Sequence, residues 1–455
     1  MAEIKKQDMG TGSVKRKMVQ LAVPAVVAQV INLLYNIVDR IYIGHIPEIG
    51  AHALTGVGLF TPILMLITAF AMLAGSGGAP LAAIAMGRGE QDRAEKIMGN
   101  CFTVLLLMAV VLTGVFCAFI PELIRLFGGS GNTIPYGVSS GRIYSLGSVF
   151  VLVVMGMNPF ITTQGFAKIS MLTTVIGAVI NIILDPILIF ALDLGVAGAA
   201  IATVLSQAVS AVWILRFLTG KKTMLKLRFG NMILEPGVIL PCLGLGVSSF
   251  VMVSTESILS VSFTSSLFRY GGDVAVGAMT VLTSVNQVIS MPLVGICQGG
   301  QPLMSYNYGA GKLDRVKEAF LCQFTVCVSY ATVFWVLVQL FPSFFAGIFT
   351  NEQALVDYTA WAMRIFLAGC FSVGFQNSCQ QAFVALGQAK ISLFMACLRK
   401  LILLIPLIFI LPNFFQNKAM AVFLAEPVSD ILAAAAATTA FFLFFRRLMK
   451  TGKAE

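Results

Sequence analysis

Five carboxylates stand inside long apolar stretches of this sequence, where an ionisable side chain is unusual. They belong to Asp39, Asp185, Glu256, Glu426 and Asp430, out of 20 acidic residues in the chain. A charge at the centre of a bilayer costs about 2.5–3.5 kcal/mol on insertion scales, so such a residue usually faces a water-filled cavity or a partner. These carboxylates are therefore candidates for binding an ion or a charged substrate. Structural pairing between helices is the alternative.

Polar side chains accompany the first of these carboxylates at helical spacing. One helix face carries Gln29, Asn32, Asn36 and Asp39, which follow one another at steps of three or four residues. Because the rest of this helix is apolar, such a stripe must line water or pack against protein. Gln29 and Asn36 are candidate substrate contacts.

The second carboxylate has an amide one helical turn away. Asn181 and Asp185 stand at positions i and i+4, and Pro186 has no N–H to offer the preceding turn. A free carbonyl beside a carboxylate and an amide suits a hard cation, which prefers oxygen ligands. A further polar stripe begins at Thr203. The topology predicted below places Asp39, Asp185 and Thr203 in the outer half of the bilayer, where they could meet.

The second half of the chain carries the other three carboxylates. Glu256 lies on the predicted seventh span, and Glu426 and Asp430 lie at i and i+4 on the twelfth. Further polar stripes are predicted on the eighth span, at Thr280, Thr283, Ser284 and Gln287, and on the tenth, at Gln376 and Gln380. Glu256, Gln287 and Glu426 are candidate substrate contacts. Hydrogen bonding between packed helices is the alternative for the stripes.

The composition shows what must position these residues. Of 455 residues, 58% are hydrophobic and 11% are charged, against about 25% charged in an ordinary soluble domain. Apolar stretches of the roughly 20 residues needed to cross a bilayer recur along the whole chain. We predict an all-α polytopic membrane protein with twelve transmembrane helices, at 18–43, 52–76, 98–120, 138–160, 170–193, 195–218, 238–266, 274–298, 318–341, 358–384, 391–412 and 418–445.

The basic residues predict the orientation. If the N-terminus is cytoplasmic, the cytoplasmic segments hold 22 of the 30 Lys and Arg residues. Short loops rich in Lys and Arg stay inside the cell, so both termini are expected in the cytoplasm. The net charge of +10 thus reflects topology, and no nucleic-acid partner is expected.

The two halves of the sequence are related by an offset of 222 residues. Gly, Pro, Asp, Arg and Lys recur in register, for example in 77–81 against 299–303 and 167–170 against 389–392. We predict a duplicated six-helix unit, with an N-terminal lobe at 1–218, a cytoplasmic linker at 219–236 and a C-terminal lobe at 237–455. Six spans per repeat make the repeats parallel, which is a transporter architecture with the substrate path between halves.

Some functions are disfavoured by what the sequence lacks. The nearest approach to a phosphate-binding loop, at 306–313, lacks its first Gly and its Ser/Thr. The two histidines have no Cys or carboxylate at metal spacing, which argues against a membrane metalloenzyme. We therefore expect no enzyme activity and no cofactor.

The pattern resembles the multidrug and toxic compound extrusion (MATE) family over nearly the whole chain. The resemblance is carried by 36–39 with Gly44, and by the paired Gly-Gly-x-Pro segments with the Gly-x-Gly that follows each. Asp39, Asn181, Asp185 and Thr203 match positions that form a cation site in the N-terminal lobe of prokaryotic members. This implies that the four residues bind the coupling ion, which is Na⁺ or H⁺.

The resemblance implies two pseudo-symmetric six-helix bundles in a V, in the bacterial plasma membrane, that act as a monomer. It implies a secondary active antiporter that exports amphiphilic, mostly cationic drugs in exchange for Na⁺ or H⁺. Members that use a second cation site pair an acid like Glu256 with one on the tenth helix, where this sequence has Gln376, Asn377 and Gln380. Glu256 is therefore expected to attract the drug's charge.

Two alternatives stay open. A flippase for lipid-linked saccharides has the same superfold but favours a more cationic cavity. A channel is disfavoured, because discrete buried carboxylates in duplicated lobes suit alternating access better than a continuous pore.

Overall fold

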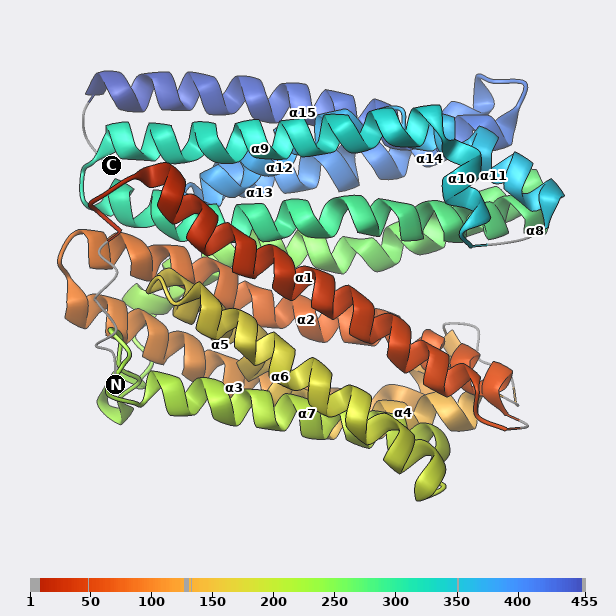
Figure 1. Cartoon of the computed structure of the whole chain (residues 1–455), viewed down its shortest axis with the longest axis horizontal. Coiled ribbons are helices and arrows are strands. Elements are labelled where there is room, and N and C mark those ends of the chain that lie inside the picture. The colour runs from red at the N-terminus through yellow and green to blue at the C-terminus, as the bar shows by residue number, and fades with distance from the viewer. Residues whose placement is uncertain (1–8, 48, 127–130, 132, 350–351, 452–455) are drawn as a thin grey trace. The chain divides into compact units, whose positions relative to one another are not determined.

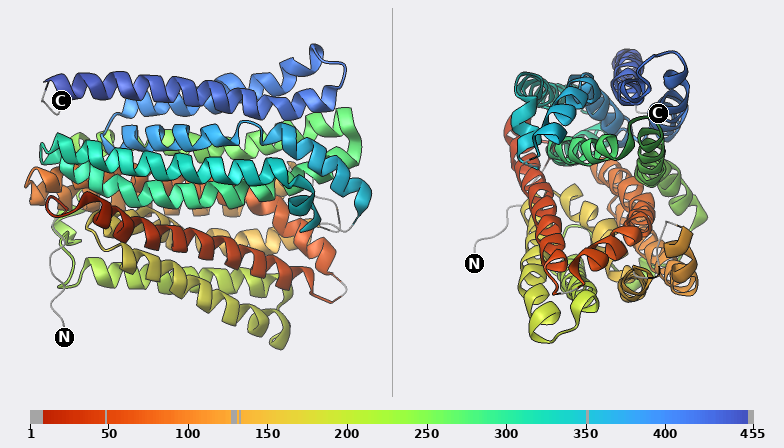
Figure 2. Two further views of the ribbon diagram at one scale, coloured as in Figure 1. Left: turned by 45° about the horizontal axis from the view of Figure 1, so that its top comes forward. Right: turned by 90° about the vertical axis from the view of Figure 1, so that its right-hand side faces the viewer.

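The computed structural model describes residues 9–47, 49–126, 131, 133–349 and 352–451, which form helices joined by loops, with no β-strand among them (Figure 1 and Figure 2). In the first half the elements are α1 (Val14–Gly44), α2 (Gly50–Gly87), α3 (Gln91–Leu126), α4 (Ile134–Leu146), α5 (Ser148–Thr163), α6 (Ala167–Pro186), η1 (Ile187–Ala191) and α7 (Gly195–Leu218). They continue with η2 (Phe229–Asn231), α8 (Pro236–Gly309), α9 (Leu313–Leu340), α10 (Pro342–Gly347), α11 (Gln353–Phe366), α12 (Cys370–Ala385), α13 (Ala389–Cys397), η3 (Leu398–Leu404), α14 (Ile405–Ile410), η4 (Leu411–Asn413) and α15 (Lys418–Thr451).

The predicted all-α architecture of about twelve spans is confirmed. Nine helical segments of the described residues are long and apolar enough to cross a membrane, and two bent pairs each make one more. The bent pairs are α4 with α5, at 55°, and α11 with α12, at 47°. Within α8, Gly272 has non-helical backbone angles and divides the segment into two helices. Counting α8 twice gives twelve spans in the described part of the chain.

The described chain forms two compact units. Unit 1 consists mainly of Val27–Val253, and unit 2 of residues 10–26 and 254–451. The boundaries fall inside α1 and α8 rather than in the loop that joins α7 to α8. The lobe limits expected from the sequence, 1–218 and 237–455, therefore stay a prediction about the repeats.

Equivalent glycines allow backbone contact in each unit. In unit 1 a Cβ atom on Gly77 or Gly246 would overlap the backbone of the other helix, at Cys242 or Leu73, so α2 and the start of α8 touch directly. In unit 2, Gly299 meets the backbone of Ala22 in the same way. Gly77 and Gly299 are related by the 222-residue offset. Close packing through small residues is typical of helices in membranes.

Polar side chains hold the segment between α7 and α8 in unit 1. The buried Gln164 Oε1 accepts hydrogen bonds from Thr223 Oγ1, Met224 N and Leu225 N at 2.7–2.9 Å. The buried Glu95 accepts one from Lys226 N at 3.0 Å. The segment is thus packed against unit 1.

Candidate functional site

The candidate cation residues come together at the ends of three helices in unit 1. Asn181 Nδ2 on α6 donates to Asp185 Oδ1 at 3.3 Å and to Thr203 Oγ1 on α7 at 3.4 Å. The Thr203 hydroxyl donates in turn to Ala199 O at 3.0 Å. Asp39 on α1 is close enough for its charge to act on Asp185. The i, i+4 spacing thus lets Asn181 contact both Asp185 on its own helix and Thr203 on α7.

Several oxygens of this cluster are buried and have no hydrogen-bond donor. They are Asp39 Oδ1, Asn181 Oδ1 and Asp185 Oδ2. A buried acceptor without a partner costs about 1–3 kcal/mol, and more when it is charged. Because Asn181 turns its N–H₂ toward Asp185 and Thr203, its carbonyl oxygen stays available. The cluster offers three unsatisfied oxygens to a bound cation or proton.

The set of ligands fits a hard cation rather than a transition metal. No three His, Cys, Asp or Glu side chains of the described residues come together as a metal site. A cation at this cluster would be held by mixed carboxylate, amide and hydroxyl oxygens, which suits Na⁺. A proton shared between Asp39 and Asp185 would equally relieve the repulsion between the two carboxylates.

The local backbone around this cluster departs from a regular α-helix. The α6 helix ends at Pro186, and the π-helix η1 follows at once, with Leu192 N bonded to Ile187 O at 2.9 Å. Proline supplies no N–H, so the helix changes its hydrogen-bond pattern where Asp185 stands. Short π segments are frequent at functional sites.

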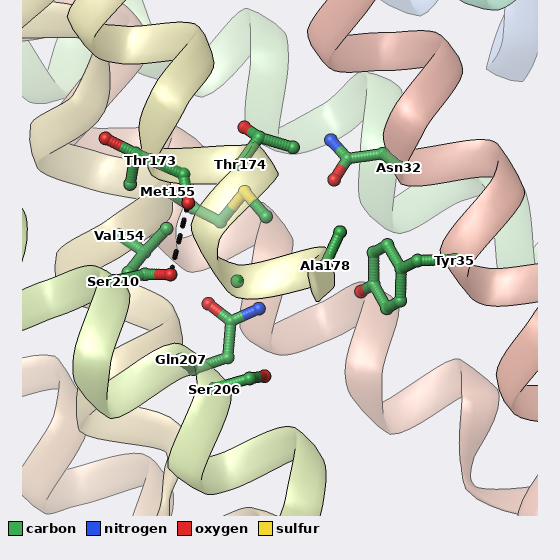
Figure 3. A pocket seen from close by; sticks show the side chains of 11 residues that line it. Asn32, Tyr35, Val154, Met155, Thr173, Thr174, Ala178, Ser206, Gln207 and Ser210 are labelled. Atoms are coloured by element: carbon green, nitrogen blue, oxygen red, sulfur yellow. Dashed lines mark hydrogen bonds between the residues drawn. The ribbon is translucent and has the colours of Figure 1, made fainter. Parts of the chain in front are cut away.

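A small cavity with several polar side chains in its lining lies beside α1, α6 and α7 (Figure 3). Its residues on α6 and α7 begin one helical turn from Asn181 and Thr203. Its volume is about 30 Å³, enough for one or two waters. Its polar lining comes from α1, α6 and α7, at Asn32, Tyr35, Thr173, Thr174, Ser206, Gln207 and Ser210. The Gln207 Oε1 atom is buried without a donor. The cavity thus extends the polar region away from Asp185.

Sequence reasoning missed Tyr35 and only partly placed its neighbours on α1. Tyr35 lies four residues before Asp39 and lines the cavity. It is close enough to Asp39 and Asp185 to interact electrostatically with both carboxylates. Its helical spacing from Asp39 was the available signal. Asn36 is exposed and donates to Asn32 O at 2.6 Å, while Gln29 is half-buried further toward the start of α1. A substrate role for Asn36 and Gln29 stays a prediction.

The second group of carboxylates lies in unit 2 and is paired with basic residues. Lys400 Nζ donates to Glu256 Oε1, and the Arg399 guanidinium lies 2.8 Å from Asp430 and 3.7 Å from Glu426. The Glu256 carboxylate is therefore paired with the Lys400 ammonium, and its expected attraction of the drug's charge stays a prediction. The alternative of structural pairing holds for this contact.

Other polar stripes of unit 2 also form hydrogen bonds between or within helices. Gln380 Nε2 on α12 donates to Ser392 O at 2.8 Å, as expected for packed helices. Thr283 and Ser284 donate to carbonyls of their own helix, one turn earlier. Gln287 on the same helix is exposed. A substrate contact at Gln287 or Glu426 stays a prediction.

The arrangement of membrane-spanning helices in two repeats, with a buried polar cluster inside one unit, is that of a polytopic membrane transporter. A family model for MatE matches the chain twice, at residues 24–187 and 247–410. This chain belongs to the MatE family. The two matches also agree with the duplication inferred from the sequence, and the resemblance to MATE transporters is confirmed.

Similar proteins carry names that refer to multidrug export or multidrug resistance. The chain is 24% identical over 407 residues to the multidrug export protein MepA of Staphylococcus saprophyticus, covering 89% of this chain and 88% of that protein. It is 26% identical over 371 residues to the probable multidrug resistance protein YoeA of Bacillus subtilis, covering 78% and 79%.

Solved structures share the fold. A crystal structure of MATE in complex with MaL6 superposes with a TM-score of 0.91 at 22% identity, covering 98% of this chain and 100% of that one. An outward-facing multidrug resistance MATE transporter of the MOP superfamily gives 0.91 at 22% identity, covering 98% and 99%.

Proposed function

We propose that this chain is a secondary active multidrug exporter, which exchanges Na⁺ or H⁺ for amphiphilic, mostly cationic organic compounds. The observation that carries the proposal is the set of buried oxygens without donors at Asp39, Asn181 and Asp185. A membrane-buried cluster with two carboxylates that repel each other is costly unless a cation or proton binds there. The names of the MepA and YoeA relatives support drugs as the cargo.

Each residue of the cluster has a distinct role in this mechanism. Asp39 and Asp185 supply the negative charge that the coupling ion neutralises. Asn181 orients Asp185 through its N–H₂ group and presents its own carbonyl oxygen, and Thr203 supports Asn181 from α7. Because Asp39 and Asp185 come from different helices, ion binding favours the arrangement that brings α1 and α6 together. An ion shifts a conformational equilibrium by its difference in affinity for the two states.

Efflux from proteoliposomes tests the proposal. A fluorescent organic cation is loaded, and an Na⁺ gradient and a pH gradient are imposed separately. We expect one gradient to accelerate efflux, and Asp39→Asn and Asp185→Asn each to abolish that acceleration. The matched control is Asp193→Asn, because Asp193 is exposed, lies eight residues after Asp185 and has a positive φ that Asn tolerates. Gradient-independent leakage through the wild type would contradict a coupled exchanger.

The flippase alternative has less support. Its anionic lipid-linked substrate favours an excess of positive charge in the membrane interior. In unit 2 the two buried basic residues, Arg399 and Lys400, each contact a carboxylate, and the group as a whole has three acids. When all five side chains are ionised, this group of unit 2 therefore carries an excess of negative charge, which suits a cationic cargo.

A further inference from the structure

Five charged side chains of unit 2 form one group, in which acidic residues outnumber basic residues by one. The acids are Glu256, Glu426 and Asp430, and the bases are Arg399 and Lys400. Glu426 and Asp430 share the single guanidinium of Arg399, whereas Glu256 has the ammonium of Lys400. With all five groups ionised, the group carries one net negative charge. It can accept one further monovalent cation.

The two bases of this group differ in the chemistry of their side chains. Arg399 donates through Nε and Nη2 to Asp430 at 2.8 Å, and its backbone carbonyl accepts from Ser429 Oγ at 2.9 Å. Lys400 is a single ammonium on a flexible four-carbon stem. Besides Glu256, the carboxylate of Glu426 is close enough to act on Lys400 electrostatically. Glu426 also lies 3.7 Å from the guanidinium of Arg399, the residue next to Lys400 in the chain, so it is the second acid to which Lys400 could turn.

Lys400 and Glu256 differ in how much of each side chain is exposed. The Lys400 side chain is 6% exposed, while that of Glu256 is 51% exposed. A half-exposed carboxylate on a membrane span is expected to face water or ligand rather than lipid. A ligand can thus reach Glu256 from the open side, whereas Lys400 approaches it from the buried side.

Both bases occupy consecutive positions of the π-helix η3. In a regular α-helix consecutive side chains point about 100° apart, and the wider π turn changes these directions. Here Arg399 meets α15 and Lys400 meets α8. Within this π segment, two adjacent basic residues accordingly pair with acids on two different helices.

We propose that Lys400 is a tethered competitor for the cationic substrate at Glu256 and sets the charge preference of the transporter. When a monovalent organic cation pairs with Glu256, the Lys400 ammonium turns to Glu426. Three cations then face three carboxylates. This inference rests on the proposed export of organic cations and adds the residue that selects for their charge.

The exchange needs an acceptor for Lys400. A buried ammonium without a counter-charge is strongly unfavourable, so Lys400 can leave Glu256 only because Glu426 shares its partner with Asp430. A neutral compound brings no charge to replace Lys400 at Glu256 and cannot drive this exchange. The mechanism thus predicts an effect on the ratio of affinities for charged and neutral ligands, which a purely structural ion pair would leave unchanged.

Binding to purified protein tests the inference, with tetraphenylphosphonium as the monovalent cation and triphenylphosphine oxide as the neutral comparison. Lys400→Met removes the competitor and leaves a half-exposed Glu256, so we expect about tenfold tighter cation binding, or about 1.4 kcal/mol. Glu426→Gln removes the acceptor for Lys400, so we expect about tenfold weaker cation binding although Glu426 does not touch the ligand. Affinity for the neutral compound should change less than twofold in both variants.

Two further variants keep this test decisive. Glu256→Gln/Lys400→Met removes both partners, which is better tolerated than leaving Lys400 buried alone, and it should lose the preference for the cation. The matched control is Lys96→Met, which breaks an exposed pair with Glu235 of 2.8 Å and should change neither affinity.

The outcomes separate this inference from the proposed function. Unchanged or weaker cation binding in folded Lys400→Met, with normal binding in the wild type, would overturn the role of Lys400 alone. Equal changes for the cation and the neutral compound would do the same. Failure of the wild type to bind the cation would overturn both proposals.

Discussion

Replacing both carboxylates of the unit 1 cluster, one at a time and together, tests whether Asp39 and Asp185 bind the same ion. Each carboxylate has one buried oxygen without a hydrogen-bond donor. An interaction of a charged group contributes about 1.5–3 kcal/mol. Each Asp→Asn change should therefore weaken coupling-ion affinity by about 10- to 150-fold, since 1.4 kcal/mol corresponds to a factor of ten.

The double variant distinguishes one shared site from two independent sites. Independent sites would give a summed loss of about 3–6 kcal/mol, because distant substitutions add to within about 0.3–0.5 kcal/mol. If both residues bind one ion, the first substitution already removes most of the affinity that the pair provides, and the second removes little more. We expect a total loss of about 1.5–3 kcal/mol, close to that of one single variant.

The assay is the dependence of efflux on ion concentration in proteoliposomes, together with the thermal midpoint of each purified variant. Each substitution removes one of two buried charges that repel each other, so the midpoint should stay level or rise. This separates loss of ion binding from misfolding. Losses in the double variant that equal the sum of the single losses would refute the shared site.

Three more predictions follow from the packing and the topology. A single cysteine at Lys222 should react with a membrane-impermeant thiol reagent only from the cytoplasmic side, and labelling from outside intact cells would contradict the orientation inferred from the basic residues. Gly246→Val should lower the thermal midpoint by several degrees, because its side chain would overlap the Leu73 carbonyl, whereas the control Gly244→Val, with open space around it, should not. Gln164→Ala should cost about 1–3 kcal/mol in a denaturation measurement, because it leaves the N–H groups of Met224 and Leu225 without their acceptor, and a stable variant would show that water replaces the amide.

The sequence predicted the span pattern and the repeat because both are one-dimensional signals. Apolar length set the spans, and glycine and proline in register revealed the duplication. The bends between α4 and α5 and between α11 and α12 could not be predicted from the sequence. The change of direction at Gly147, between α4 and α5, depends on tertiary packing, since its neighbour there is Val204 of α7.

Contacts within the candidate sites could be predicted where they join residues close in sequence, and not where they join distant ones. Asn181 and Asp185 are neighbours through helical spacing, so their contact followed from the sequence. The pairing of Lys400 with Glu256 joins residues 144 positions apart, and no local pattern indicates which of two adjacent bases meets which acid. Tyr35 was overlooked because an aromatic side chain on an apolar helix carries no signal of its own until a cavity is known.

Because α1 and α8 are each divided between the two units, each half of the chain contributes to both units. Residues 10–26 belong to unit 2 although they open the first repeat, and the start of α8, up to Val253, belongs to unit 1 although it opens the second. Two separate copies of one repeat arranged in this way would form a dimer with exchanged first segments. A cut in the 219–235 loop would accordingly leave two fragments that each contribute to both units, so coexpressed halves should assemble without a peptide bond between them.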